Sequence, residues 1–232
     1  MRVTRPVLVT TSAAVLAALV VAGCTPTPDQ PTPTEQASTV PVESPSPAEP
    51  VSDSVCGLDA VRMAGDLIEA PASEWELVGT TPAPISAAMG PGTTDPDGLR
   101  SCFARTPEGA VFAAANILAL GSSPALVGPM TDRLTVAGPG RDAAMADLAA
   151  RVSMGGSAVR YEIAAFALTS YDGSTATVDV VIRASNQALL AQMIDLEWVD
   201  GDWKVALADS GQMRTPMGAV QSLAGYVPWG EP

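Results

Sequence analysis

The stretch TATVDVVIRA, residues 175–184, decides the fold class of this chain. Apolar side chains stand at every second position, and polar side chains occupy most of the positions between them. A period of two is the pattern of a β-strand with one buried face. The predicted buried face consists of Ala176, Val178, Val180 and Ile182.

Further strand patterns lie on both sides of this stretch. Residues 159–171 have strand character, and Asp172-Gly173 predicts a hairpin turn between them and the central strand. Residues 188–199 form a third strand pattern, and Asp200-Gly201 predicts a tight turn into a last strand at residues 203–207. The second half of the chain is therefore predicted to be a four-stranded antiparallel meander with one apolar face.

Helix signals come before the meander. Thr106-Pro107-Glu108 combines a capping residue, a proline at the first helical position and an acid near the positive helix end, and predicts a helix to about Leu120. Further helices are expected from Ser123-Pro124 to about residue 132 and over residues 141–152. A turn or short helix is expected over residues 215–224.

The order of these elements predicts an α+β fold. Residues 54–105 are rich in loops, and residues 74–80 (EWELVGT) are the best strand candidate among them. The chain has no alternation of strand, helix and strand, which a parallel α/β sheet would need. We expect the helices to cover the apolar face of the meander, within one domain that spans residues 54–232.

The first 23 residues have the pattern of a secretory signal peptide. Arg2 and Arg5 precede an apolar run of about 15 residues, which is short for a membrane span. The run ends in Val-Ala-Gly-Cys at residues 21–24, which resembles a bacterial lipobox. The resemblance implies that Cys24 carries the lipid and that the domain lies at the extracytoplasmic face of the cell membrane. The alternative is an uncleaved signal anchor with an incidental cysteine.

Residues 24–53 are expected to be a disordered linker behind the lipidated cysteine. Prolines make up eight of the 29 residues from 25 to 53, and most others are Thr, Ser, Glu or Asp. Such a segment lacks the apolar surface that would offset the entropy of ordering. We interpret it as a stalk, and a proline-rich ligand for a partner is the alternative.

Composition excludes several chemistries. The net charge of −13 disfavours a nucleic-acid partner, because phosphate binding needs a basic face. The chain has no histidine, which removes imidazole catalysis and histidine-ligated metals. No metal site or cofactor is predicted. With Cys24 lipidated, Cys56 and Cys102 are an even pair in an exported domain and are expected to form a disulfide, with two free thiols as the alternative.

Acidic pairs offer little support for an enzyme. Asp195 and Glu197 lie two apart on one predicted strand and share a face, which we expect to be solvated. Glu74 and Glu76 have the same spacing and the same interpretation. Asp200-Gly201-Asp202 lacks the other ligands of a calcium loop and is explained by a hairpin turn. We therefore expect a protein that is not an enzyme.

The C-terminal stretch Gly-Tyr-Val-Pro-Trp, residues 225–229, has two interpretations. Its aromatic side chains can pack on the body of the domain. Alternatively, Tyr226 and Trp229 form an exposed interaction tail, since Tyr and Trp are frequent at binding hot spots.

Element order over residues 106–208 resembles the nuclear transport factor 2-like cone fold. Residues 102–110, 138–144 and 225–229 resemble an uncharacterised family of actinobacterial lipoproteins. The layout of that family is similar to accessory proteins of integrative and conjugative elements. The resemblance implies a scaffold or accessory role beside an envelope protein and identifies no catalytic residue.

Two hypotheses follow from the sequence. The first is a non-catalytic, lipid-anchored scaffold or accessory subunit of cell-envelope machinery, with an exposed apolar patch as its mark. The second is a binding module that holds a small apolar ligand inside the cone. Its mark would be a cavity lined by side chains such as Ile163, Val180, Ile194 and Trp203.

Overall fold

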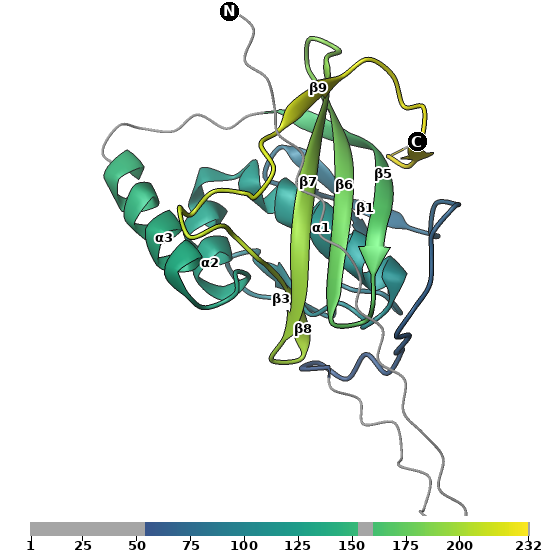
Figure 1. Ribbon diagram of the computed structural model, residues 1–232, viewed down its shortest axis with the longest axis horizontal. Helices are drawn as coiled ribbons and strands as arrows, with labels where there is room; N and C mark the ends of the chain where they lie inside the picture. The colour runs from purple at the N-terminus through teal and green to yellow at the C-terminus, as the bar shows by residue number, and fades with distance from the viewer. Residues whose placement is uncertain (1–53, 153–159, 232) are drawn as a thin grey trace, which may run out of the picture. The chain divides into compact units, whose positions relative to one another are not determined.

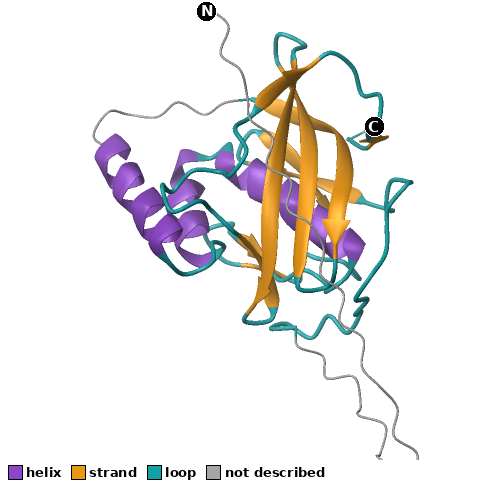
Figure 2. Cartoon of the chain, in the orientation of Figure 1, coloured by secondary structure: helices purple, strands orange, loops and turns teal. Residues whose placement is uncertain are grey.

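The computed structural model describes residues 54–152 and 160–231. The predicted signal peptide, lipidated Cys24 and linker lie outside these residues. The described chain contains helices and antiparallel strands in the order expected of an α+β fold (Figure 2). The predicted α+β class is therefore confirmed.

One sheet of six strands forms the second half of the chain. The meander consists of β5 (Tyr161–Tyr171), β6 (Thr175–Ala184), β7 (Leu189–Val199) and β8 (Asp202–Val205), each antiparallel to the next. The prediction of four strands is incomplete, because β10 (Val227–Pro228) pairs with β5 and β9 (Gly218–Val220) pairs with β7. These two short strands come from the C-terminal stretch, so the chain end returns to the sheet.

The prediction of a helix or turn at residues 215–224 is wrong, because strand β9 lies within this range. Strand β8 pairs with β7 only from Leu196 to Val199, which leaves the other end of this edge of β7 open. Residues 218–220 pair with Leu189, Leu190 and Ala191 at that open edge. Backbone groups of β7 that would lack partners are thereby paired.

Helix α1 (Pro107–Gly121) is the centre of the fold. The Thr106 hydroxyl accepts a hydrogen bond from the Gly109 N–H at 3.0 Å, as the capping signal predicts. Residues 109–120 are all buried, which is expected of a helix that is apolar on all sides. Figure 1 shows α1 behind the sheet, where it contacts β5, β6 and β7.

The remaining elements surround α1. A hairpin of β1 (Glu74–Val78) and β2 (Thr81–Ile85) covers another side of the helix, since β2 contacts α1. Helices α2 (Pro124–Arg133) and α3 (Pro139–Val152) follow α1 near their predicted positions. A short pair, β3 (Thr93–Thr94) and β4 (Arg100–Ser101), precedes the helix.

The face of the sheet that covers α1 is fully packed. Ile163, Val180, Ile194 and Trp203, which we expected to line an internal pocket, are all buried in one apolar cluster with α1. Phe112 of α1 belongs to the same cluster and is 0% exposed. These side chains therefore form a filled core, because α1 occupies the space that a ligand in a cone would need.

Candidate interaction surface

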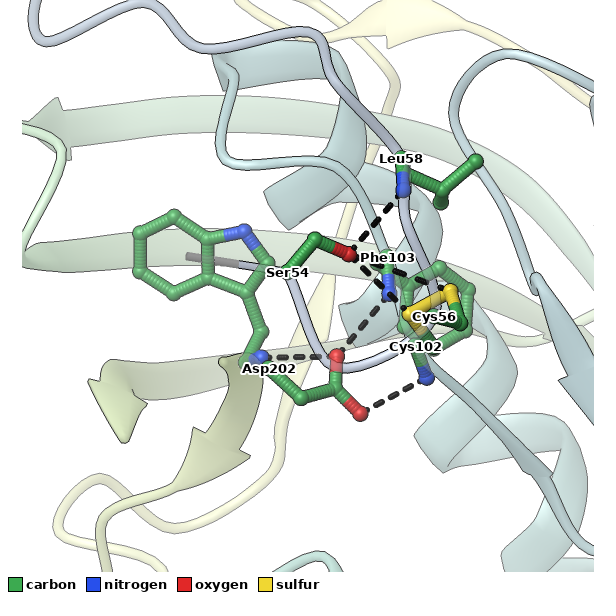
Figure 3. The surroundings of a disulfide bond; sticks show 7 residues. Ser54, Cys56, Leu58, Cys102, Phe103 and Asp202 are labelled. Atoms are coloured by element: carbon green, nitrogen blue, oxygen red, sulfur yellow. Dashed lines mark hydrogen bonds between the residues drawn. A yellow bond between two sulfur atoms is a disulfide. The ribbon is translucent and has the colours of Figure 1, made fainter. Parts of the chain in front are cut away.

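A disulfide joins the start of the domain to the segment before α1. Cys56 and Cys102 are bonded, with their Cα atoms 6.2 Å apart, so the predicted disulfide is present. The Ser54 hydroxyl lies 3.3 Å from the Cys102 sulfur and accepts a hydrogen bond from the Leu58 N–H at 3.2 Å (Figure 3). The first described residues are therefore held against the fold by one covalent bond and by local hydrogen bonds.

A buried carboxylate supports the other side of this disulfide. Asp202 accepts hydrogen bonds from the backbone N–H groups of Cys102 at 2.7 Å, Phe103 at 2.9 Å and Trp203 at 2.8 Å (Figure 3). Burial raises the pKa of Asp202 above its ordinary value, and the three N–H donors act in the opposite direction. The carboxylate thus links the disulfide-bearing segment to the first residue of β8.

Sequence reasoning missed this role of Asp202. The turn predicted at Asp200-Gly201 is present, and both residues have the positive φ values, 53° and 77°, of a tight hairpin turn. The position of Asp202 directly after the turn indicates a strand start and carries no sign of burial. Only the approach of residues 102–103, about 100 positions away in the chain, creates the buried site.

We call residues 54–72 the N-terminal strap. Its first half is fastened to the end of the sheet, where the Val55 N–H donates to the Gly201 carbonyl at 3.0 Å. The Arg62 N–H donates to the Arg105 carbonyl at 2.8 Å, and its side chain forms an ion pair with Glu108. Figure 1 shows this segment in dark blue, starting at the lower end of β8.

The strap also lies directly on the β5–β6 turn. The Tyr171 hydroxyl donates to the Arg62 carbonyl at 2.5 Å. A Cβ added at Gly173, whose φ is 80°, would lie 2.9 Å from the Met63 Cα atom. The glycine therefore serves both the turn and the close approach of the strap.

The second half of the strap makes few hydrogen bonds. No backbone-to-backbone hydrogen bond is formed by residues 64–72 within the described chain. The Pro71 carbonyl accepts from the Ser73 hydroxyl at 2.8 Å. Ile68 is 86% exposed, so an apolar side chain stands in solvent on this open segment.

Exposed apolar side chains concentrate in and near the strap. Of the six large apolar residues exposed in the described part of the chain, five lie between residues 55 and 77. The sixth is Met217, in the loop before β9. The five are Val55, Val61, Met63, Ile68 and Leu77.

Trp229 is a core residue, so the exposed-tail interpretation is wrong for this side chain. Trp229 is 5% exposed, and its ring lies 5.3 Å from each of the rings of Trp75, Phe112 and Phe166. Its Nε1–H donates to the Ser73 hydroxyl at 2.9 Å. The indole gains this apolar contact while its one polar group finds a partner, which favours burial.

Tyr226 also binds within the chain. It is half-buried, and its hydroxyl donates to the Asp179 carboxylate at 2.7 Å. Burial and this hydrogen bond raise the pKa of Tyr226 to about 12. The packing interpretation of the C-terminal stretch therefore describes both aromatic residues.

Three of the other acidic candidates lie beside an arginine side chain. Asp195 accepts from the Thr177 hydroxyl at 2.9 Å, and Arg214 lies 3.9 Å from the carboxylates of both Asp195 and Glu197. Glu76 pairs with Arg100 at 2.7 Å, separately from its exposed neighbour Glu74. Within residues 54–152 and 160–231, no group of three His, Cys, Asp or Glu residues is placed to hold a metal ion.

The fold and its surface define a disulfide-linked α+β domain with exposed apolar residues near its N-terminal boundary. None of the helices described here has the length and apolar character needed to cross a bilayer. The sequence matches the domain of unknown function DUF8175 over residues 14–228, so the chain belongs to that family. No curated protein and no solved structure matches the chain.

Proposed function

We propose that this protein is a non-catalytic, lipid-anchored extracytoplasmic domain that serves as a scaffold or accessory subunit of cell-envelope machinery. The observation that carries the proposal is the concentration of exposed apolar side chains at residues 55–77. Single exposed apolar residues are ordinary, whereas several on one short segment offer a protein partner apolar side chains to cover. The surface begins directly after the linker that would tether the domain.

The disulfide supports the extracytoplasmic part of the proposal. Bonds such as Cys56–Cys102 form and persist in oxidising compartments outside the cytoplasm. The DUF8175 match includes Cys24 and the linker, so this N-terminal region is part of the family pattern. The linker would reach roughly 30 Å as a coil and about 90 Å if fully extended.

The same observations favour binding of a protein over the alternative of an internal apolar ligand. A ligand in the cone would need the space that α1 and Phe112 occupy. A more specific role beside integrative and conjugative elements, and the cone-like form of the sheet, rest on the resemblances in the sequence. They remain predictions within this proposal.

Two measurements in the native bacterium test the proposed function. The variant Cys24→Ala is expected to leave the membrane fraction, because it lacks the lipidated cysteine, and Cys56→Ala serves as a control that keeps Cys24. Crosslinking in cells should then capture one stoichiometric envelope protein with the wild type and much less of it with Cys24→Ala. Membrane retention of Cys24→Ala would refute the anchor, and failure of the wild type to capture any specific protein would refute the scaffold role.

A further inference from the structure

A groove lies between the strap and the segment that follows β2. Two adjoining cavities of about 640 Å³ and 590 Å³ share the lining residues Ala72 and Ser86. One side of the groove is formed by residues 66–76 of the strap and β1. Residues of the range 85–94 and Glu108 of α1 also line the groove. We call this feature the acidic groove.

Every charged side chain that lines the acidic groove is negative. Glu76 and Glu108 are paired with Arg100 and Arg62, whereas the other three carboxylates have no basic partner among the residues that the structure describes. A groove with this charge attracts cationic groups and repels anionic ones. The five acidic residues are Asp66, Glu69, Glu74, Glu76 and Glu108.

The strap side of the groove also has backbone groups that a partner can use. Residues 64–72 form no backbone-to-backbone hydrogen bond in the described chain, so their N–H and C=O groups, apart from those of Pro71, have no main-chain partner there. An extended peptide binds such a segment through main-chain hydrogen bonds, as in other cases of strand addition. This observation is independent of the charge of the groove.

Apolar side chains complete the groove. Ile68 lines it and is 86% exposed, and the half-buried Met89 and Ile85 line the two cavities. A peptide in extended conformation presents alternate side chains to opposite sides. A segment that alternates apolar and basic residues can therefore cover Ile68 with one set and approach the carboxylates with the other.

We propose that the acidic groove binds an extended segment of a protein partner in which apolar and basic residues alternate. The proposal rests on the proposed function, because it specifies the surface and the chemistry of the scaffold's partner. The groove favours this occupant over a second copy of the chain, since two copies with a net charge of −13 each repel one another.

A peptide probe tests the chemistry of the site. The probe is an eight-residue fluorescent peptide of alternating lysine and valine, capped at both ends, and its binding to the full mature chain is followed by anisotropy. We expect binding that weakens with salt, and roughly tenfold weaker binding by Ile68→Ser because an apolar contact is lost. The double variant Asp66→Asn/Glu69→Gln should bind several-fold more weakly and with a smaller salt dependence.

Matched controls separate the groove from the rest of the surface. Met217→Ser removes an exposed apolar side chain elsewhere and should bind like the wild type. A glutamate–valine peptide should not bind, and N-methylation of alternate peptide bonds in the lysine probe should weaken binding. The proposal is overturned if the lysine probe fails to bind, or if Ile68→Ser and the charge variant bind it as tightly as the wild type. It is also overturned if the chain sediments as a dimer that Ile68→Ser dissociates.

Photo-crosslinking in cells separates this proposal from the proposed function. A photoreactive residue is placed at position 68 in one strain and at position 217 in another. Capture of a protein from position 68 but not from position 217, together with binding of the lysine probe, supports both. Capture from position 217 alone overturns the proposal of binding at the acidic groove but agrees with the scaffold role. Capture from neither position overturns the groove proposal, and crosslinking of the wild type then decides the scaffold role.

Discussion

The N-terminal strap and the C-terminal tail, residues 221–231, both contact the same sheet, but the tail buries its main apolar side chain and the strap exposes its own. The tail inserts Trp229 among three aromatic rings and pairs β10 with β5. The strap is fastened by Cys56 and Arg62 and then leaves Ile68 86% exposed. Aromatic content alone would indicate the tail as the binding segment.

The difference has a physical reason. An indole that reaches a cleft between a strand and a helix buries a large apolar area, and its N–H needs only one acceptor, which Ser73 provides. Ile68 lies on a segment whose backbone forms no backbone-to-backbone hydrogen bond with the rest of the described chain, so no strand or helix pairing draws it into the core. The tail thus contributes to the core, while the strap is the segment that we propose for binding.

The largest effect is expected from the tail. Trp229→Ala should lower the free energy of unfolding by roughly 3–5 kcal/mol, because it empties a site between Trp75, Phe112 and Phe166. Urea unfolding at neutral pH measures the change. The control Tyr226→Phe removes only the hydrogen bond to Asp179 and should cost about 1 kcal/mol. A loss below that of Tyr226→Phe would mean that Trp229 is not part of the core in solution.

The second largest effect is expected from loss of the disulfide that attaches the strap to the fold. The double variant Cys56→Ala/Cys102→Ala should be less stable by about 2–4 kcal/mol, because it frees a loop of 46 residues in the unfolded chain. Limited proteolysis should then cut near residues 64–72 sooner than in the wild type, since one attachment of the strap is lost. Equal rates of cleavage would show that the hydrogen bonds of Val55 and Arg62 suffice to hold the strap.

The Asp202 carboxylate holds the segment that carries Cys102, the partner of Cys56 in the disulfide. Asp202→Asn should cost roughly 1–3 kcal/mol, because one oxygen cannot accept from all three N–H groups. The folded state raises the pKa of Asp202 above 3.8, mainly through burial. Its stabilising contribution is therefore complete below pH 3.8 and is lost as the pH rises through the raised pKa.

Unfolding in urea at a series of pH values measures this dependence. The difference in unfolding free energy between wild type and Asp202→Asn should be largest at the acidic end and should narrow as the pH rises. Asp200→Asn is the control, because it changes an exposed carboxylate on the same turn that pairs with Lys204. A difference that widens with pH would contradict the raised pKa of Asp202 and would mean that the three N–H donors outweigh burial.

Local signals in the sequence were sufficient for the meander and the first helix. Strand β6 has the bounds expected from its alternation, and α1 begins where Thr106-Pro107 indicates. These elements depend on periodicity and capping, which are properties of neighbouring residues. The disulfide was predictable for a similar reason, since it followed from cysteine count and compartment.

The features that were not predicted depend on distant residues. Gly218–Val220 has no strand pattern and pairs only because β8 leaves part of the β7 edge open. Trp229 is buried because Ser73, Trp75 and Phe112 meet it from other parts of the chain. The sequence places the strap in a loop-rich region but does not show that Ile68 is exposed. The three-dimensional fold determines this exposure.

The smallest effect on stability is expected at Ile68, the position most important for the proposed binding. Ile68→Ser should change the free energy of unfolding by less than about 0.5 kcal/mol, because an 86% exposed side chain has little contact to lose. Urea unfolding of Ile68→Ser and Trp229→Ala under the same conditions compares the contributions of the strap and the tail to stability. A loss above 1.5 kcal/mol for Ile68→Ser would place this side chain in the core, and the contrast between strap and tail would fail. An unchanged stability would mean that any loss of partner binding by this variant reflects the groove and not the fold.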